Sequence, residues 1–203
     1  MTTPLTNVLS AIDDINRQDI NITLYDHEKH PKELLYGQRM TACLTLHWPH
    51  SSELLQIAVR AQHIKRWHLK RSEFAANKAG YYQWRIALGK FHAELTSAIM
   101  LEHGYTHEQA AQTASIICKE NLRSKTANQL NLDSQTLEDV ACLVFLEHYF
   151  DEFSAKYIEQ GNEAKIIRIV QLTWQKMSEE AHTIALQLTL PEHLSVLVAK
   201  ALA

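Results

Sequence analysis

Apolar residues recur along most of the chain at the three- and four-residue spacing that is typical of amphipathic helices. Near the N-terminus this spacing joins Leu5, Val8, Ile12 and Ile15. The same pattern predicts further helices over residues 33–46 and 53–68. It then predicts a long helix whose buried stripe contains Trp84, Leu88, Phe91, Leu95 and Ile99. No segment alternates with a period of two over a useful length, so no strand is predicted.

Polar residues with short side chains mark where several of these helices begin. The expected N-caps are Ser52, Thr106, Ser134 and Asn162. Thr106 is followed three residues later by Gln109, which is the pattern of a capping box. The helix after this box is expected to reach about Leu122.

Glycine and proline act as helix breakers in this sequence. Gly104 is expected to end the long helix and Gly161 to end the helix after Ser134. Pro191 separates the last two short helices, and residues 69–80 form the longest predicted loop. The chain has only 5 glycines and no GxGxxG or GxxxxGK[ST] motif, which argues against Rossmann and P-loop folds. We therefore predict an all-α fold, one compact multi-helix domain over residues 1–203.

Composition and charge narrow the class of protein. The chain has 203 residues and a formal net charge of −3, so neither nucleic acid nor an anionic membrane is an expected partner. It carries no signal-peptide pattern, and no apolar stretch approaches the roughly 20 residues that span a bilayer. Cys43, Cys118 and Cys142 are widely spaced and form no CxxC pair, as is typical of reduced thiols. We therefore predict a cytoplasmic protein.

Three of the predicted helices carry an ionisable group in apolar surroundings. His63 shares a helix face with Trp67, and His92 lies on the apolar stripe of the long helix. Asp139 directly precedes the apolar residues 140–146. Because imidazole and carboxylate suit iron, manganese or zinc, we predict a divalent metal site formed by His63, His92 and Asp139. Each residue also has a structural interpretation, either as a satisfied core histidine or as an acid near a helix N-terminus.

Further polar residues are candidates for catalysis and substrate binding. Glu138 stands beside Asp139 and is the expected general base on a metal-bound water. Arg66 is expected to stabilise charge that develops during the reaction. The expected substrate-binding residues are Arg60, Trp67, Arg71 and Arg85. The basic residues over 65–71 are also typical of a helix C-terminus, where cations interact favourably with the helix dipole.

Two short patterns resemble known enzymes. The order of His63, His92 and Asp139 resembles that of HD phosphohydrolases, which are helical metal enzymes that act on phosphate esters. In that family the second histidine is followed directly by aspartate, whereas Ala93 follows His92 here. Lys176-Met177-Ser178 matches part of the KMSKS signature of class I aminoacyl-tRNA synthetases, but a HIGH-type motif and a nucleotide-binding core are missing. We therefore predict that the protein is not an aminoacyl-tRNA synthetase.

Longer motifs are spread over most of the chain. They are Ser52-Glu53, Arg60 to Ile64, Arg66-Trp67, Gly80-Tyr81, Trp84-Arg85, Phe91-His92-Ala93, Gln135, Glu138-Asp139-Val140, Cys142 to Glu147, and Trp174 with Lys176-Met177-Ser178. Together they resemble an uncharacterised family, domain of unknown function 4202, whose fungal relatives have been labelled glutamyl-tRNA synthetase. The resemblance implies a helical cytosolic protein in which the following residues belong together: Arg60, His63, Arg66, Trp67, Arg85, His92, Glu138 and Asp139.

Two functions are expected, and they differ in whether an ion is bound. In the first, the protein is a metal-dependent hydrolase that acts on a small phosphorylated or otherwise anionic molecule. In the second, the same groups form a metal-free network that binds a ligand or a partner, with arginines paired to Glu138 and Asp139. A third interpretation is a helical interaction protein that uses Trp67 or Tyr81-Tyr82.

Overall fold

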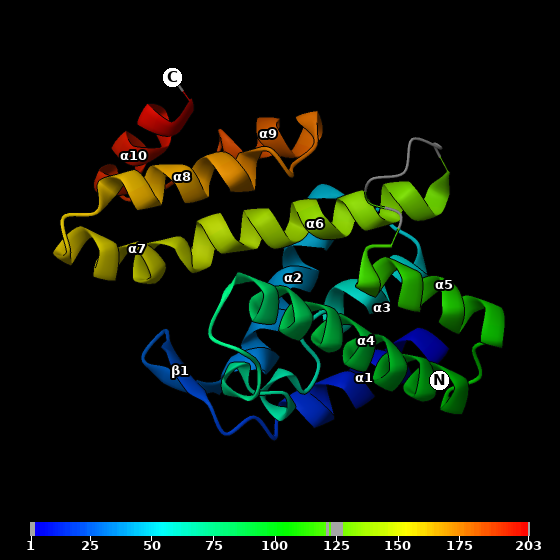
Figure 1. Cartoon of the computed structure of the whole chain (residues 1–203). Coiled ribbons are helices and arrows are strands. Elements are labelled where there is room, and N and C mark those ends of the chain that lie inside the picture. The colour runs from blue at the N-terminus through cyan, green and yellow to red at the C-terminus, as the bar shows by residue number, and fades with distance from the viewer. Residues whose placement is uncertain (1–2, 121, 123–127, 203) are drawn as a thin grey trace. The chain divides into compact units, whose positions relative to one another are not determined.

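The computed structural model of the chain is almost entirely helical, which confirms the predicted all-α class (Figure 1). The structure describes residues 3–120, 122 and 128–202. It divides the chain into two compact units, residues 1–137 and 138–203, and helix α6 (Gln129–His148) contributes to both. Within the described ranges, no helix is both long enough and apolar enough to cross a membrane.

The first unit is built around a short central helix. Its elements are α1 (Pro4–Asn16), β1 (Ile22–Tyr25), β2 (Glu28–Pro31), α2 (Lys32–His47), α3 (Glu53–Ala61), α4 (Lys78–Glu102), α5 (His107–Cys118) and the start of α6. Helix α3 packs against α1, α2, α4 and α5. It therefore buries residues on nearly all sides, namely Leu55, Ile57, Ala58, Val59 and Ala61.

An antiparallel hairpin precedes α2, so the prediction that the chain has no strand was wrong. Strands β1 and β2 pair Ile22 with Pro31 and Tyr25 with Glu28. Asp26 and His27 connect them, and both have positive φ angles, 50° and 63°. Two successive left-handed residues suit the twist of a two-residue hairpin turn. The sequence pattern missed this hairpin because its strands are short and mostly exposed, and its turn contains no glycine.

Helix α3 ends seven residues earlier than the pattern predicted, at Ala61 instead of His68. The backbone turns at Lys65, which has a φ angle of 51°. Its N–H group donates a hydrogen bond of 2.9 Å to the side-chain oxygen of Asn16 in α1. This contact from a distant helix satisfies a backbone donor outside the helical ladder, so the chain leaves α3 and forms a 3₁₀ turn at Arg66–His68.

Helices α4 and α5 follow the predicted capping pattern closely. Gly104 ends α4 with a φ angle of 89°, and Thr106 with Gln109 forms the predicted capping box of α5. Helix α5 ends at Cys118, short of the predicted Leu122, because Lys119 adopts a left-handed conformation. Helix α4 begins within the predicted loop 69–80, where the Asn77 side chain caps it by accepting the N–H of Gly80.

The second unit contains the end of α6 and four further helices. These are α7 (Phe150–Glu159), α8 (Glu163–Trp174), α9 (Glu179–Ala185) and α10 (Glu192–Leu202). Asn162 caps α8, and Pro191 precedes α10, as predicted. Two expectations for α6 were wrong. The helix begins at Gln129, so Ser134 is buried inside it and does not cap it, and the helix breaks at Tyr149 before the predicted end.

Gly80 and Gly89 both lie in α4 and provide a matched test of its packing. A Cβ atom at Gly80 would lie 2.1 Å from the backbone oxygen of Ala75, whereas a Cβ atom at Gly89 meets nothing within 4 Å. We expect Gly80→Ala to destabilise the protein by about 1–3 kcal/mol. We expect Gly89→Ala to stabilise it by about 0.5–1 kcal/mol, because alanine loses less backbone entropy in a helix. Urea unfolding of both variants measures this, and equal effects would contradict the packing around residues 75–80.

Candidate functional site

A carboxylate and an imidazole from distant parts of the sequence meet in the first unit. Glu33 lies in the first turn of α2, and His63 lies in the turn that follows α3. The Nδ1 atom of His63 is 3.1 Å from Oε2 of Glu33. The ring of Tyr36 stacks on the His63 ring, with 4.0 Å between the ring centres. The orientation of His63 is therefore held from two sides by residues of α2.

A side chain from the segment after α1 fixes the backbone of Glu33. Helix α2 follows directly on β2, and its N-cap residue Pro31 makes no side-chain capping bond. Instead, the buried carboxylate of Asp19 accepts the backbone N–H of Glu33 at 3.1 Å. The second oxygen of Asp19 accepts the N–H of Asn21. Asp19 therefore acts as a distant cap that fixes the first turn of α2, where Glu33 lies.

His92 in α4 brings a second imidazole to the same place. Its ring centre is 6.2 Å from that of His63, and the residue is only 2% exposed. A hydrogen bond with the backbone of Gln62 favours its protonation, whereas its Nε2 atom has no hydrogen-bond partner among the described residues. The bonded nitrogen is therefore Nδ1. A buried ring nitrogen without a partner is costly, so His92 stands out as a site for a ligand or a proton.

Two arginines give this cluster a positive electrostatic environment. The guanidinium of Arg66 lies over the ring of Trp84, 4.9 Å from its centre. The indole N–H of Trp84 donates to the backbone oxygen of Leu69 at 3.0 Å, which fixes the 66–69 segment against α4. Arg85, two turns before His92 on α4, is exposed and donates to the hydroxyl of Tyr81.

The environment shifts the pKa of each group in the direction that favours its neutral form. Burial raises the pKa of Glu33 to about 7, although Arg66 and Lys32 act in the opposite direction. Burial, together with Arg66 and Arg85, holds the pKa of His63 well below its usual value. Burial, His63 and Arg66 do the same to the pKa of His92. Near pH 7 both imidazoles are therefore neutral and Glu33 is close to its midpoint of ionisation.

The other predicted substrate-binding residues are engaged elsewhere in the first unit. Arg60 forms a two-bond ion pair with Asp13 of α1, at 2.7 and 2.6 Å. Arg71 donates to the backbone oxygens of Phe74, Ala75 and Asn77 and so holds the loop before α4. Trp67 is half-buried next to Arg66. Of the predicted arginines, Arg66 and Arg85 are the ones whose charge acts on His63 and His92.

Glu138 and Asp139 belong to the second unit, where both have partners of their own. Asp139 accepts hydrogen bonds from the backbone N–H and the hydroxyl of Ser178, at 2.9 and 2.6 Å, immediately before α9. Glu138 pairs with Lys176 at 3.4 Å. In the described part of the chain, no three His, Cys, Asp or Glu side chains are grouped so that they could hold a metal ion. The shared site of His63, His92 and Asp139 and the base role of Glu138 stay predictions.

Glu33 and Tyr36 are the members of the cluster that sequence reasoning missed. Glu33 stands at the start of a helix, where acids are common because they favour the helix dipole. The signal that could have identified it is its spacing from Gly37, Met40 and Leu44, which share its helix face, because a carboxylate on an apolar face requires a partner.

These features define a mainly helical protein with a pair of neutral histidines, His63 half-buried and His92 buried, beside a carboxylic acid and two arginines. The chain belongs to the family described as Domain of unknown function (DUF4202), whose model matches residues 6–198. This confirms the resemblance of its motifs to that family. No curated protein and no solved structure matched the chain.

Two substitutions in the cluster are expected to change the pH dependence of stability in opposite directions. An unfolded His92 binds a proton below about pH 6.5 and the folded residue does not, so its burial reduces stability as the pH falls. Folded Glu33 keeps its proton up to pH 7, and it therefore adds stability as the pH falls from 7 toward 4.5. Relative to wild type, His92→Gln should gain stability between pH 6.5 and 5, and Glu33→Gln should lose it.

Urea unfolding at several pH values measures both slopes. Each group contributes at most about 1.4 kcal/mol per pH unit. His107→Gln is the matched control, because His107 is exposed at the start of α5 and should leave the slope unchanged. The quantity compared is the change in unfolding free energy with pH, relative to wild type. The same sign of this change in both cluster variants would show that the two groups do not titrate as their burial requires.

Proposed function

We propose that the first unit binds a small anionic molecule, such as a phosphate ester, and hydrolyses it at the cluster of Glu33, His63 and His92. The observation that carries this proposal is the pair of neutral imidazoles held beside two arginines. Each imidazole has one nitrogen engaged, His63 with Glu33 and His92 with the backbone of Gln62. The other nitrogen of each ring has no protein partner among the described residues, so it is free to act on a ligand.

Arg66 and Arg85 supply the charge that attracts the substrate. Arginine binds phosphate and carboxylate groups through two parallel hydrogen bonds and remains charged at neutral pH. Arg60 and Arg71 already use their donors on Asp13 and on loop carbonyls. The positive field at the cluster also stabilises negative charge that develops on the substrate when water attacks it.

In this proposal His63 acts as the general base. When Glu33 is ionised, it accepts the Nδ1–H of His63, so that Nε2 carries the lone pair. That nitrogen then takes a proton from the attacking water, and Glu33 stabilises the imidazolium that forms. When Glu33 is protonated, it donates to Nδ1 of His63, so the ring proton moves to Nε2. That nitrogen then has no lone pair and cannot act as the base. The rate should therefore rise with pH near the pKa of Glu33.

A metal-dependent form of the same reaction is the second candidate, and one observation favours it. Histidines that bind metal ions commonly direct one ring nitrogen to a carboxylate or a backbone carbonyl and the other to the ion. His63 and His92 have this division of partners. Iron, manganese or zinc held by the two Nε2 atoms would lower the pKa of a bound water and so generate the nucleophile.

Substrate-analogue binding and turnover test the proposal on the full chain. Inorganic phosphate and pyrophosphate, titrated by calorimetry, should bind wild type and lose at least about tenfold in affinity in Arg66→Met and Arg85→Met. Arg168→Met is the matched control, because Arg168 is exposed on α8 in the second unit. Equal affinities in all four proteins, or no binding, would overturn the anion site.

Turnover of p-nitrophenyl phosphate tests the base and the ion together. His63→Gln should lower kcat by roughly 100-fold or more, as is usual when a general base is removed, and His107→Gln should not change it. Activity that survives a chelator supports the metal-free form. Activity that the chelator removes and manganese or zinc restores supports the metal-dependent form. A folded His63→Gln variant with wild-type activity would contradict both.

A further inference from the structure

Aromatic rings of α4 adjoin both arginines of the proposed anion site. The guanidinium of Arg66 lies over the Trp84 ring, 4.9 Å from its centre, and the guanidinium of Arg85 donates to the hydroxyl of Tyr81 at 3.3 Å. The centres of the Tyr81 and Trp84 rings are 6.0 Å apart. Contacts therefore run from one arginine through two aromatic rings to the other arginine.

Two of these residues belong to a face of α4 that leads to His92. Tyr81, Arg85, Gly89 and His92 are separated by four, four and three residues, so each is a neighbour of the next on the helix surface. His92 is buried, Gly89 is half-buried, and the other two residues are exposed. A Cβ atom at Gly89 would meet nothing within 4 Å, so space is open beside this face between Arg85 and His92. The face therefore connects the protein surface to the buried imidazole.

The two arginines of this face and its neighbour lack an acidic partner. Among the described residues, no carboxylate forms an ion pair with Arg66 or Arg85. Burial lowers the pKa of Arg66, the Glu33 carboxylate acts against this shift, and the charge of Arg85 adds to it. An anion that contacts both guanidinium groups relieves their mutual repulsion.

Tyr81 offers an aromatic surface next to such an anion. The residue is 41% exposed, and its neighbours Tyr82 and Trp84 are tilted from it by 61° and 50°, so neither is stacked on its ring. An exposed ring of this kind stacks on the flat base of a nucleotide, while an arginine beside it binds the phosphate. Because Arg85 contacts the hydroxyl of the same ring, the base and the phosphate are separated by a short linker, such as a pentose.

We propose that the anion taken by this site is a phosphate ester of a nucleoside. Its base stacks on Tyr81, and its phosphate is held by Arg66 and Arg85. This inference rests on the proposed anion site and names the class of molecule that the site binds. Stacking of the base fixes the ester at the outer end of the face, so that its phosphate lies on the side of His92.

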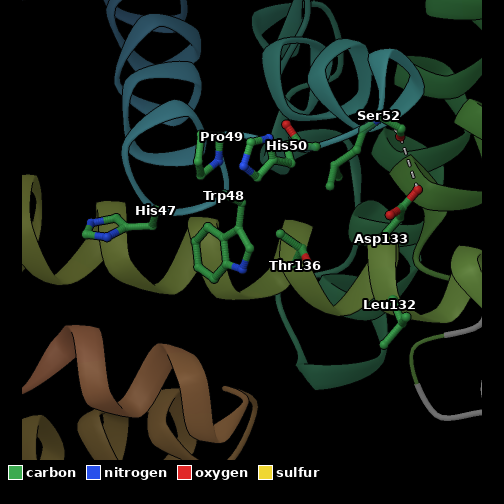
Figure 2. A pocket seen from close by; sticks show the side chains of 10 residues that line it. His47, Trp48, Pro49, His50, Ser52, Leu132, Asp133 and Thr136 are labelled. Carbon is green, nitrogen blue, oxygen red and sulfur yellow. Dashed lines mark hydrogen bonds between the residues drawn. The ribbon is translucent and has the colours of Figure 1, made fainter.

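The described residues of the first unit also form a hollow with an aromatic wall (Figure 2). Its volume is about 330 Å³, and it lies between the turn after α2 and the start of α6. Figure 2 shows the Trp48 ring extending from this turn. None of the lining residues belongs to α4 or to the histidine cluster. Substitution of Trp48 therefore separates base stacking in this hollow from base stacking on Tyr81.

Three probes separate the contributions of the base and the phosphate. Adenosine 5′-monophosphate, ribose 5-phosphate and adenosine are titrated by calorimetry near pH 7.5 into the full-length His63→Gln protein, in which hydrolysis of a bound ester should be slow. The monophosphate should bind at least about tenfold more tightly than either of the others, because it alone makes both contacts. Equal affinities for the monophosphate and ribose 5-phosphate would overturn the inference and leave the anion site standing. Equal affinities for the monophosphate and adenosine, or no binding of the monophosphate, would overturn both.

Variants in the same background place the base on Tyr81. Tyr81→Leu should lower the preference for the monophosphate over ribose 5-phosphate to about one, whereas Tyr81→Phe keeps the ring, loses only the hydroxyl and should retain the preference. Trp48→Leu is the matched control and should also retain it. Melting curves establish that each variant is folded. An unchanged preference in a folded Tyr81→Leu protein, or its loss in Trp48→Leu, would exclude Tyr81 as the stacking residue.

Discussion

The turn that ends α3 is the constraint on which the site of the first unit depends. The side chain of Asn16 accepts the backbone N–H of Lys65, and this bond draws the chain out of the helix and into a left-handed turn. A continued helix would carry His63 and Arg66 onward along α3. The turn instead places His63 against Glu33 and Tyr36 of α2 and sets Arg66 over Trp84 of α4. A side-chain contact from α1 to the backbone at Lys65 thus helps to set which side chains of α2, α4 and the turn after α3 meet.

The cluster concentrates ionisable groups where burial disfavours charge. Glu33 and His92 are both buried. Burial raises the pKa of Glu33 and lowers that of His92, so the neutral form of each is favoured. Such groups contribute less to stability than apolar side chains of the same size, because their desolvation is only partly offset by hydrogen bonds. Their arrangement has a chemical consequence instead. It keeps imidazole lone pairs available near pH 7 in a field set by two arginines, which is the condition that general-base catalysis on an anion requires.

Several charged groups of the chain hold local structure, whereas two arginines act on the histidine cluster. Arg60 with Asp13, Asp19 with Glu33 and Asp139 with Ser178 tie helices or turns together, and their donors and acceptors are used in that role. Arg66 and Arg85 act instead on the two histidines, whose pKa values they help to lower.

Local patterns in the sequence determined the helical class, the capping box at Thr106 and the end of α4 at Gly104. Periodicity and capping depend on residues only a few positions apart, so a short stretch of sequence contains them. Tertiary contacts decided the rest. The hairpin uses two left-handed residues without glycine, and α3 stops where Asn16 reaches Lys65, so neither carries a local signal. Glu33 joined the histidines because Asp19 fixes its helix turn from 14 residues away, and Asp139 caps the region before α9 because Ser178 reaches it from 39 residues away. Hydrogen bonds between groups so distant in the chain follow from how the helices pack, which no window of the sequence contains.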